Sequence, residues 1–534
     1  MNSVCRVSLG LGRDIRDGLA ARSYSVAMAG ACLVLAALAS ATAADAASRR
    51  SDRDLEARLR HHIEVLASDE FGGREPGTDG EAKTLRYLGK EWFEIGLVSG
   101  TNDPGNEWFA PVSLVAREPA TSTAQFFRPG RRAALVPKDM LVLTSGKRSL
   151  VRNAPLLFVG TGAVDELSRN ELAGRVAVLL DQPDDDQPSA SDTNSGETTG
   201  SERQSALLAM GAAAVLTVLD GERSIDEVSA RRMRSGYALS EDSVGGDLEA
   251  FISRKEMESL LEGTGKSLAA LEGLAAQPSF RPLALDMTAT LEATTRAKTI
   301  HTHNLIGKLP GRFPDKGAVL FLAHWDHFGT CGEAPAEDTI CNGAIDNASG
   351  VAALTEIARQ LAKGPQLDRD IYFLSTSAEE LGLLGAHAFA ENPPIPLEQF
   401  IAAFNIDSNA IAPRGTPFAI VGQGMTGLDD AIAKVAKQER FRLRSDDAAN
   451  EFVRRQDGWA LLQHDIPAVM VTTAYGEIDR MRAFFDGDYH RPSDDVSRKL
   501  ELGGEVDDVK MLTALGRWFG DLRRTPEKVE AATP

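Results

Sequence analysis

Five short segments of the chain each contain a residue type that binds metal ions, and together they supply two histidines and three carboxylates. These residues are His324, Asp346, Glu380, Asp407 and His490. Histidine nitrogen and carboxylate oxygen are zinc ligands where cysteine is absent, and a catalytic zinc site keeps one position open for water. Two neighbouring zinc ions can polarise a carbonyl group and activate water. The inventory therefore predicts a hydrolase with two zinc ions.

The small residues around one of these carboxylates suggest that it bridges the two metals. A bridging ligand is needed for a close metal pair, and the two oxygens of a carboxylate can each face one ion. Asp346 lies in a segment of small residues between Gly343 and Gly350, which allows the backbone to approach the metals closely. Asp346 is therefore the candidate bridge.

Two further acidic residues are candidates for catalytic roles beside the ligands. Glu379 precedes Glu380, and adjacent side chains do not point the same way on a regular element. One of the pair can bind metal while the other takes a proton, so Glu379 is the candidate general base. Asp326 follows His324 by two residues and can orient its other ring nitrogen. Asp494 is a weaker candidate for the same role beside His490.

The predicted elements place most of these residues at one edge of a sheet. Apolar runs at residues 318–323, 371–374, 400–404 and 466–471 predict buried strands, and residues 351–361 predict an amphipathic helix. His324, the Glu379–Glu380 pair and Asp407 all come after the carboxyl ends of predicted strands. In open α/β sheets, ligands bind beyond those ends. The pattern predicts a site at that edge.

The middle of the chain, about residues 130–285, has a different pattern of apolar and polar residues. Residues 155–160 and 175–180 have strand character, and residues 206–216 predict a helix, a glycine turn and a strand. The polar segment 181–204 predicts a mobile surface loop. Neither a cluster of metal ligands nor a nucleophile motif occurs in this region. Before it, residues 55–97 predict a helix, a turn rich in glycine and proline, and a second helix.

The overall composition is that of a large soluble protein of more than one domain. The chain has 534 residues and a formal net charge of −19, which argues against nucleic acid as the main partner. Arg13, Arg16 and Arg22 precede an apolar run at residues 26–39, and small residues come after it. This pattern predicts an export signal at residues 1–43, with an uncleaved anchor as the alternative. Export to the periplasm or the medium, without stable membrane insertion after cleavage, is the expectation.

Cysteine usage agrees with export. Cys331 and Cys341 are the two cysteines beyond the predicted leader. An even, closely spaced pair in an exported chain favours one disulfide, with two free thiols as the alternative. This disulfide would cross-link the loop between His324 and Asp346.

The other histidines are expected to be packed or surface residues, because a lone histidine is seldom a ligand. They are His61, His62, His301, His303, His327, His387 and His464.

The ligand segments resemble those of the M28 family of zinc metallopeptidases. The similar stretches are residues 323–329, 343–351, 378–385, 405–407 and 489–494, with residues 66–78 similar to the amino-terminal segment of those enzymes. The resemblance implies that His324 and Asp407 bind one zinc, that Glu380 and His490 bind the other, that Asp346 bridges them and that Glu379 is the base. It also implies a cis peptide bond after Asp346.

The resemblance implies a mixed, mainly parallel α/β sheet flanked by helices, interrupted by a β-rich protease-associated insert. The expected parts are an amino-terminal part of the peptidase domain at residues 50–128, the insert at 129–287 and the catalytic domain at 288–525. One departure concerns the substrate pocket: many relatives have Ser-Asp-His where this chain has Gln456, Asp457 and Gly458.

Peptides are the expected substrates, and an aminopeptidase is the favoured activity. A carboxypeptidase or dipeptidase on the same scaffold is the main alternative, and it would need a cation for the substrate carboxylate. Four arginines lie in the relevant late region: Arg454, Arg455, Arg480 and Arg482. A glutaminyl cyclase and a non-catalytic receptor-like protein are further alternatives. The oligomeric state and the preferred residue are left open.

Overall fold

The computed structural model describes residues 49–525 with several gaps. The gaps are residue 103, residues 106–107, 162–166, 182–199, 222–223, residue 227, residues 230–236, 240–246 and 333–335. The predicted export signal and most of the polar segment 181–204 lie outside the described residues. The chain divides into two units, residues 1–58 and 59–534. In the first unit, residues 49–58 are helical, and all the elements named below belong to the second.

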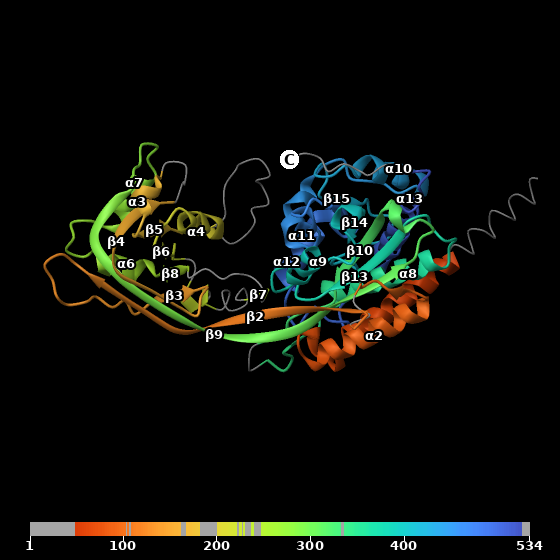
Figure 1. Cartoon of the computed structure of the whole chain (residues 1–534), viewed down its shortest axis with the longest axis horizontal. Coiled ribbons are helices and arrows are strands. Elements are labelled where there is room, and N and C mark those ends of the chain that lie inside the picture. The colour runs from red at the N-terminus through yellow and green to blue at the C-terminus, as the bar shows by residue number, and fades with distance from the viewer. Residues whose placement is uncertain are drawn as a thin grey trace, which may run out of the picture. The chain divides into compact units, whose positions relative to one another are not determined.

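One group of strands forms the sheet that the sequence predicts around the ligands (Figure 1). In sheet order these strands are β15 (Ala419–Val421), β16 (Ala468–Thr472), β14 (Phe400–Asn405), β10 (Ala318–His324), β13 (Asp370–Thr376) and β9 (Leu283–Leu309). The strands β16, β14, β10 and β13 run parallel, whereas β15 and β9 are antiparallel to their neighbours. Every residue of β10, β13 and β14 is buried.

Helices cover both faces of this group of strands. Successive residues of a strand point to opposite faces of the sheet, so strands that are buried throughout present side chains for packing on both faces. On one face, α9 (Leu384–Glu391) and α11 (Gly458–Leu462) pack with residues such as Leu320 and Leu374. On the other face lie α2 (Asp79–Ile95), α8 (Gly350–Ala362) and α13 (Leu502–Phe519). Phe404 contacts Phe519 of α13 there. These parallel strands, buried on both faces, position the site.

A second group of strands lies within the predicted insert. It comprises β4 (Arg148–Gly160), β5 (Val176–Leu180), β6 (Ala214–Val218), β8 (Leu248–Ile252) and β3 (Met140–Thr144). Parallel pairing joins β4, β5, β6 and β8, and β3 is antiparallel to β8. The short helices here are α3 (Arg169–Leu172), α4 (Gly200–Ala209), α6 (Arg254–Leu261) and α7 (Leu268–Ala275). Phe158 is among the buried residues that form its core, and the partly buried Phe280 packs against that core.

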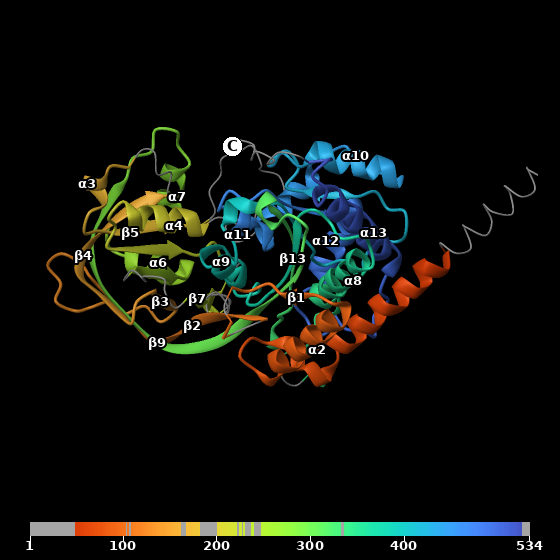
Figure 2. The ribbon, with the colours of Figure 1, turned by 45° about the vertical axis from the view of Figure 1, so that its right-hand side comes forward.

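One very long strand, β9, belongs to both groups, as Figures 1 and 2 show. Its first part pairs with β4, its last part pairs with β13, and β2 (Phe109–Phe127) pairs along most of its length. The sequence did not point to β2 or β9. Residues 296–299 of β9 are exposed, so the alternation of buried and exposed residues that marks a strand breaks there. The strand β9 runs through the predicted boundary between residues 287 and 288.

The predicted fold class is confirmed: the sheet is mixed and mainly parallel around the ligands, and helices flank it. The strands predicted at residues 318–323, 400–404 and 466–471 lie close to the observed β10, β14 and β16. Among the described residues, the structure contains no helix both long and apolar enough to cross a membrane.

Candidate metal centre

The ends of parallel strands and the start of a helix bring the predicted ligands together. His324 is the last residue of β10, Glu380 lies beyond the end of β13 and Asp407 lies beyond the end of β14. Asp346 lies in the helical turn Ala344–Ser349 that precedes α8, and His490 comes after α12 (Ile478–Gly487). Because neighbouring parallel strands end at the same edge of a sheet, side chains far apart in the sequence meet there.

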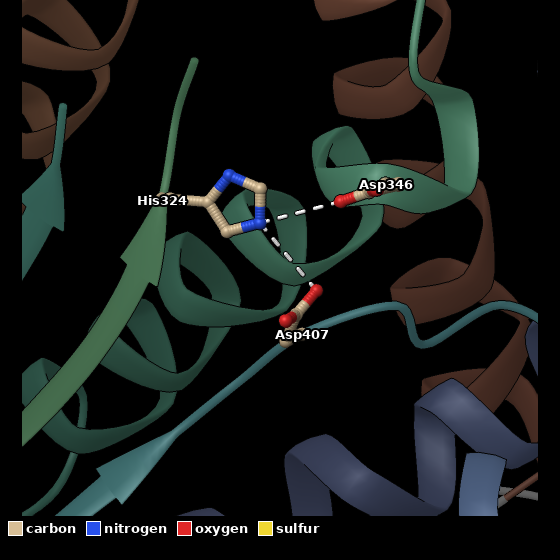
Figure 3. Close-up of side chains that lie close together, drawn as sticks. All are labelled: His324, Asp346 and Asp407. Atoms are coloured by element: carbon tan, nitrogen blue, oxygen red, sulfur yellow. Dashed lines mark ion pairs between the residues drawn. The ribbon is translucent and has the colours of Figure 1, made fainter. Parts of the chain in front are cut away.

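His324, Asp346 and Asp407 form one half of the cluster (Figure 3). The Nε2 atom of His324 lies 3.3 Å from Oδ1 of Asp346 and 3.5 Å from Oδ1 of Asp407. All three side chains are buried. Burial opposes protonation of His324, but the surrounding carboxylates raise its pKa well above the ordinary value. The three donor atoms lie close enough together to hold one metal ion.

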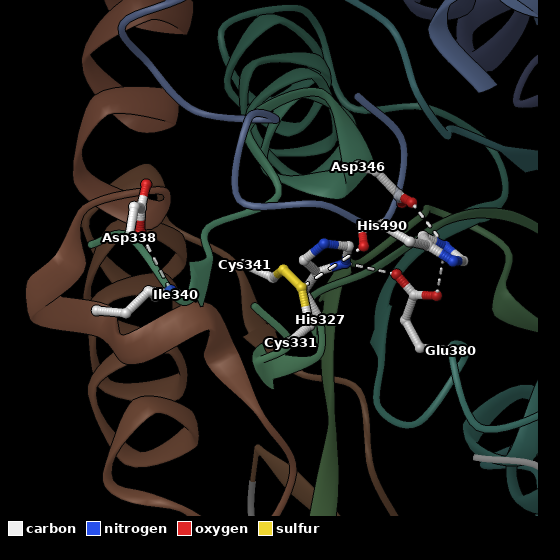
Figure 4. The surroundings of a disulfide bond; sticks show 8 residues. All are labelled: His327, Cys331, Asp338, Ile340, Cys341, Asp346, Glu380 and His490. Carbon is white, nitrogen blue, oxygen red and sulfur yellow. Dashed lines mark hydrogen bonds and ion pairs between the residues drawn. A yellow bond between two sulfur atoms is a disulfide. The ribbon is translucent and has the colours of Figure 1, made fainter. Parts of the chain in front are cut away.

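His490, Glu380 and the other oxygen of Asp346 form the second half (Figure 4). The Nε2 atom of His490 lies 3.3 Å from Oδ2 of Asp346 and 3.0 Å from Oε2 of Glu380. Asp346 therefore presents one oxygen to each histidine. Although burial opposes its ionisation, the contacts with His324 and His490 hold the pKa of Asp346 well below its usual value. This is the arrangement that a bridging carboxylate requires.

His327 lies in the same cluster, which the sequence did not indicate. Its Nδ1 atom is 2.5 Å from Oε1 of Glu380, so Glu380 contacts His490 through one oxygen and His327 through the other (Figure 4). His327, Asp346 and Glu380 also have donor atoms close enough together to hold a metal ion. The spacing of His324 and His327, with both at the end of the same strand, was the signal that could have drawn attention to it.

Glu379 lies beside the ligands without an equivalent histidine contact. Its Oε2 atom is 3.9 Å from Nε2 of His324. Burial raises the pKa of Glu379 well above its ordinary value, and the charges of Glu380 and Asp407 raise it further. The preceding residue, Ala378, has a φ of 56°, a left-handed conformation that L-residues seldom adopt. The chain therefore turns sharply where the two glutamates begin.

Asp326 and Asp494 support backbone segments rather than the rings that were expected. The carboxylate of Asp326 lies 3.8 Å from Nδ1 of His324, beyond hydrogen-bond distance, and accepts a hydrogen bond from the backbone N–H of Glu379 at 3.1 Å. The backbone carbonyl of Asp326 is the group within 3.2 Å of that ring nitrogen. Asp494 accepts hydrogen bonds from the backbone N–H groups of Ile345 and Asp346, both at 3.0 Å. Asp494 thus fixes the segment of the candidate bridge.

A buried arginine connects two of the ligand segments. Arg74 is 1% exposed, and its guanidinium donates to the backbone carbonyls of Trp325 at 2.8 Å, Asn342 at 2.5 Å and Gly343 at 3.0 Å. Burial lowers its pKa to about 10, still well above neutrality. Arg74 therefore remains a cation that joins the segment after His324 to the segment before Asp346.

Asn347 connects the candidate bridge to the segment of Asp407. Its Nδ2 atom donates to the carbonyl of Ile406 at 3.0 Å, and its Oδ1 atom accepts from the N–H groups of Gly350 at 2.9 Å and Ser408 at 3.3 Å. The peptide bond between Asp346 and Asn347 is cis, as the resemblance implied.

The predicted cysteine pair forms a disulfide near the second half of the cluster (Figure 4). Cys331 and Cys341 are bonded, with their Cα atoms 5.7 Å apart. Cys331 directly follows β11 (Gly329–Thr330), and Cys341 is the last residue of β12 (Ile340–Cys341), with which β11 forms a short hairpin. The sulfur of Cys331 lies 3.5 Å from the carbonyl oxygen of His490. The bridge therefore ties this loop together beside a candidate ligand.

Gln456 and Asp457 lie where relatives were expected to have Ser-Asp-His, and both make hydrogen bonds within the protein. Gln456 accepts a hydrogen bond from the N–H of Gly458 at 2.8 Å and donates to the carbonyl of Val453 at 3.1 Å. Asp457 is buried and accepts a hydrogen bond from the hydroxyl of Thr376 at the end of β13.

The donor set fits a pair of zinc ions. Within the described part of the chain, Nε2 of His324, Nε2 of His490 and Oδ2 of Asp346 are buried and make no hydrogen bond. Buried polar atoms are nearly always partnered, so these atoms require another partner. Two imidazole nitrogens and three carboxylates match the ligands that zinc takes in catalytic sites.

Comparisons with known proteins agree with this geometry. Residues 304–507 match peptidase family M28. The chain is 32% identical over 126 residues to the aminopeptidase YwaD of Bacillus subtilis, covering 23% of this chain and 25% of that protein. It is 38% identical over 91 residues to a vacuolar membrane protease of Schizophyllum commune, covering 17% of this chain and 9% of that protein. The matched segments thus span a quarter or less of these curated relatives.

A solved structure extends the similarity to most of the chain. The aminopeptidase from Aneurinibacillus sp. strain AM-1 superposes with a TM-score of 0.52, at 18% sequence identity. The superposition covers 89% of this chain and 94% of that chain. At this identity the match shows a shared fold.

Proposed function

We propose that this chain, whose residues 304–507 belong to peptidase family M28, is a two-zinc aminopeptidase that hydrolyses the first peptide bond of its substrates. The single observation that carries the proposal is the position of Asp346, whose two oxygens face two different histidines at the same distance of 3.3 Å. The Bacillus subtilis relative is named an aminopeptidase, which favours cleavage at the amino end.

His324 and Asp407 would hold one zinc, His490 and Glu380 the other, and Asp346 both. When bound, the two ions would polarise the scissile carbonyl and lower the pKa of the attacking water. The position of His327 against Glu380 supports a second role for this imidazole: it fixes the orientation of the Glu380 carboxylate. Arg74 and Asn347 hold the segments that carry His324, Asp346 and Asp407.

Glu379 is the proposed general base and acid. It takes a proton from the attacking water and returns it to the nitrogen of the leaving peptide. Its raised pKa, caused first by burial and then by the neighbouring carboxylates, suits a group that takes up a proton and releases it again. Asp326 holds the backbone N–H of Glu379 and so acts as a positioning residue.

Export to the periplasm or the medium is part of the proposal. The support comes from the sequence pattern of residues 1–43 and from the disulfide between Cys331 and Cys341, because disulfides persist in oxidising compartments. Peptides are the proposed partners, and the net charge of −19 disfavours nucleic acid.

The test uses the mature protein with zinc and a panel of peptides with free or blocked amino ends. We expect release of the first residue, its loss when the amine is blocked, and its loss with a chelator. Cleavage that ignores the amine but requires a free carboxyl end would replace the proposal with a carboxypeptidase. Failure to cleave either set while two zinc ions are bound would favour the cyclase or the non-catalytic protein.

A further inference from the structure

Three of the four late arginines named as candidates for substrate recognition already have partners of their own. Arg480 pairs with Glu477, and Arg482 lies 3.1 Å from Glu451. The guanidinium of Arg454 lies 5.3 Å from the ring centroid of Trp459. These contacts assign Arg480 and Arg482 to surface ion pairs and Arg454 to an aromatic contact.

Arg455 differs from these three in its position beside the metal cluster. Its guanidinium lies 4.7 Å from the ring centroid of Phe485 and 5.6 Å from that of Tyr489. Tyr489 in turn stacks on the ring of His490, with the centroids 3.5 Å apart. One aromatic ring therefore separates Arg455 from a candidate zinc ligand. The charge of Glu379 is among the groups that raise the pKa of Arg455, so the two side chains are close enough to interact electrostatically.

Arg455 makes a side-chain hydrogen bond with Tyr489, which leaves most of its five N–H donors available. Among the residues that the structure describes, no carboxylate forms an ion pair with Arg455, and the side chain is exposed. A guanidinium that lies against aromatic rings uses its flat face, while its N–H donors point outward in its own plane. Those donors match the two oxygens of a carboxylate. The aromatic contacts therefore hold the cation in place without neutralising its charge.

The aromatic residues around Arg455 form a packed wall, which limits its motion. Phe452 contacts Phe485 with centroids 5.4 Å apart and Tyr475 with centroids 5.0 Å apart, and Phe485 contacts Tyr489 at 4.8 Å. A cation held by such a wall loses less conformational freedom on binding than a free surface arginine. Arg455 also lies near the buried carboxylates of the metal cluster. Their negative charge would repel an anionic substrate if no cation were close to them.

We propose that Arg455 binds a carboxylate on the residue just after the scissile bond, so that the enzyme favours short peptides carrying a negative charge there. This inference rests on the proposed function. One extended residue spans about 3.5 Å, so a carboxylate on that residue lies close to the reacting carbonyl. The carboxylate is either the free end of a dipeptide or an acidic side chain.

The test measures binding and does not depend on turnover. Zinc-loaded protein with the substitution Glu379→Gln is titrated calorimetrically with Leu-Gly and with Leu-Gly amide, which differ in the terminal carboxylate. A second pair, Leu-Glu amide and Leu-Gln amide, differs in a side-chain carboxylate. The same titrations are made after adding Arg455→Met, with Arg454→Met as the matched control for loss of a neighbouring positive charge.

We expect one of the charged peptides to bind about 10- to 100-fold more tightly than its neutral partner, the size of one charge-assisted hydrogen-bonded pair. Arg455→Met should remove that ratio and Arg454→Met should keep it. If the difference in affinity appears between Leu-Gly and Leu-Gly amide, the carboxylate is the free end of a dipeptide. If it appears between Leu-Glu amide and Leu-Gln amide, the carboxylate is an acidic side chain. Equal affinities within both pairs, or a ratio that survives Arg455→Met, would overturn the inference. Turnover of Leu-Gly amide by the protein with Glu379 tests the proposed function separately, because that peptide has no carboxylate.

Discussion

Two groups of parallel strands in this molecule share an architecture and differ in the residues at their carboxyl ends. In the group formed by β10, β13, β14 and β16, the strand ends lead to His324, the two glutamates and Asp407. In the group formed by β4, β5, β6 and β8, β4 ends at Gly160, and β6 and β8 lead to Leu219 and Ser253. Both groups are largely buried, and Asp181 and Asp220 follow β5 and β6. Among the described residues, however, only the first group brings histidine and acidic side chains close enough together to hold a metal ion.

The distribution of buried charge shows the same division. Within the described residues, buried aspartates and glutamates such as Asp346, Asp407 and Asp494 all lie outside residues 129–287. Burying a carboxylate is costly unless partners or metal ions compensate it, so buried acids concentrate where a site needs them. A parallel sheet therefore supplies an edge at which side chains can meet, and the residues placed at that edge decide whether the site can do chemistry.

The largest expected effect comes from the proposed base. Glu379→Gln should lower kcat by about 10²–10⁴-fold, because the substitution removes proton transfer and keeps the shape of the side chain. Bound zinc, measured by atomic emission, should stay at two ions per chain. The matched control is Asp220→Asn, which removes an acid just past the end of β6 in the other group of strands. Comparable losses of kcat in both variants would break the distinction between the two groups.

The next effect concerns the arginine that joins two ligand segments. Arg74→Met leaves four buried carbonyl groups without their donor, and we expect it to lower the free energy of unfolding by about 3 kcal/mol. Since three of these carbonyls, those of Trp325, Asn342 and Gly343, belong to segments that hold His324 and Asp346, zinc affinity should also fall by about 10–100-fold. Urea unfolding and zinc titration against a competing chelator measure the two quantities.

The control for Arg74 is another buried arginine outside the cluster. Arg369 donates to the carbonyls of Lys316 at 2.7 Å, Phe519 at 2.8 Å and Thr525 at 2.6 Å. Arg369→Met should destabilise the fold to a similar extent and leave the zinc affinity of the folded protein unchanged. If both variants changed zinc affinity equally, Arg74 would have no special role at the site.

The smallest expected effect involves a buried acid beneath the site. Burial raises the pKa of Asp508 to about 7, while the carboxylate accepts hydrogen bonds from the backbone N–H of Thr473 at 2.7 Å and from Asn409 at 2.9 Å. A carboxyl group with a raised folded-state pKa favours the folded state below its unfolded value of about 4, and this contribution is lost as the pH rises to about 7.

Between pH 5 and pH 8 the wild type should therefore lose about 1–3 kcal/mol more unfolding free energy than Asp508→Asn. Urea unfolding at the two pH values measures this difference. An identical pH dependence in both proteins would show that Asp508 does not titrate in this range. This measurement distinguishes a buried acid that changes the free energy of unfolding from the buried acids that are proposed to act in the reaction.

Local sequence patterns were sufficient to predict the strands that carry the site. Continuous apolar runs marked β10 and β14, and the residues after them were recognisable as ligand types. The same reasoning failed for β9, because the exposed residues 296–299 interrupt its alternation. That strand is held by pairing with β2, whose partner residues lie far away in the sequence, such as Arg117 opposite Ala297. Local pattern does not contain such information.

The sequence by itself determined the chemical inventory: which residues can bind zinc, which acid is spare, and which strands precede them. Only the tertiary structure decided that Asp346 faces both histidines, that His327 contacts Glu380, and that Arg74 joins segments about 250 residues away along the chain. The physical reason is the range of the interactions. Hydrophobic periodicity acts over a few residues and is visible in the sequence. Hydrogen bonds and ion pairs need contact, and contact between distant segments exists only once the sheet has brought them to one edge.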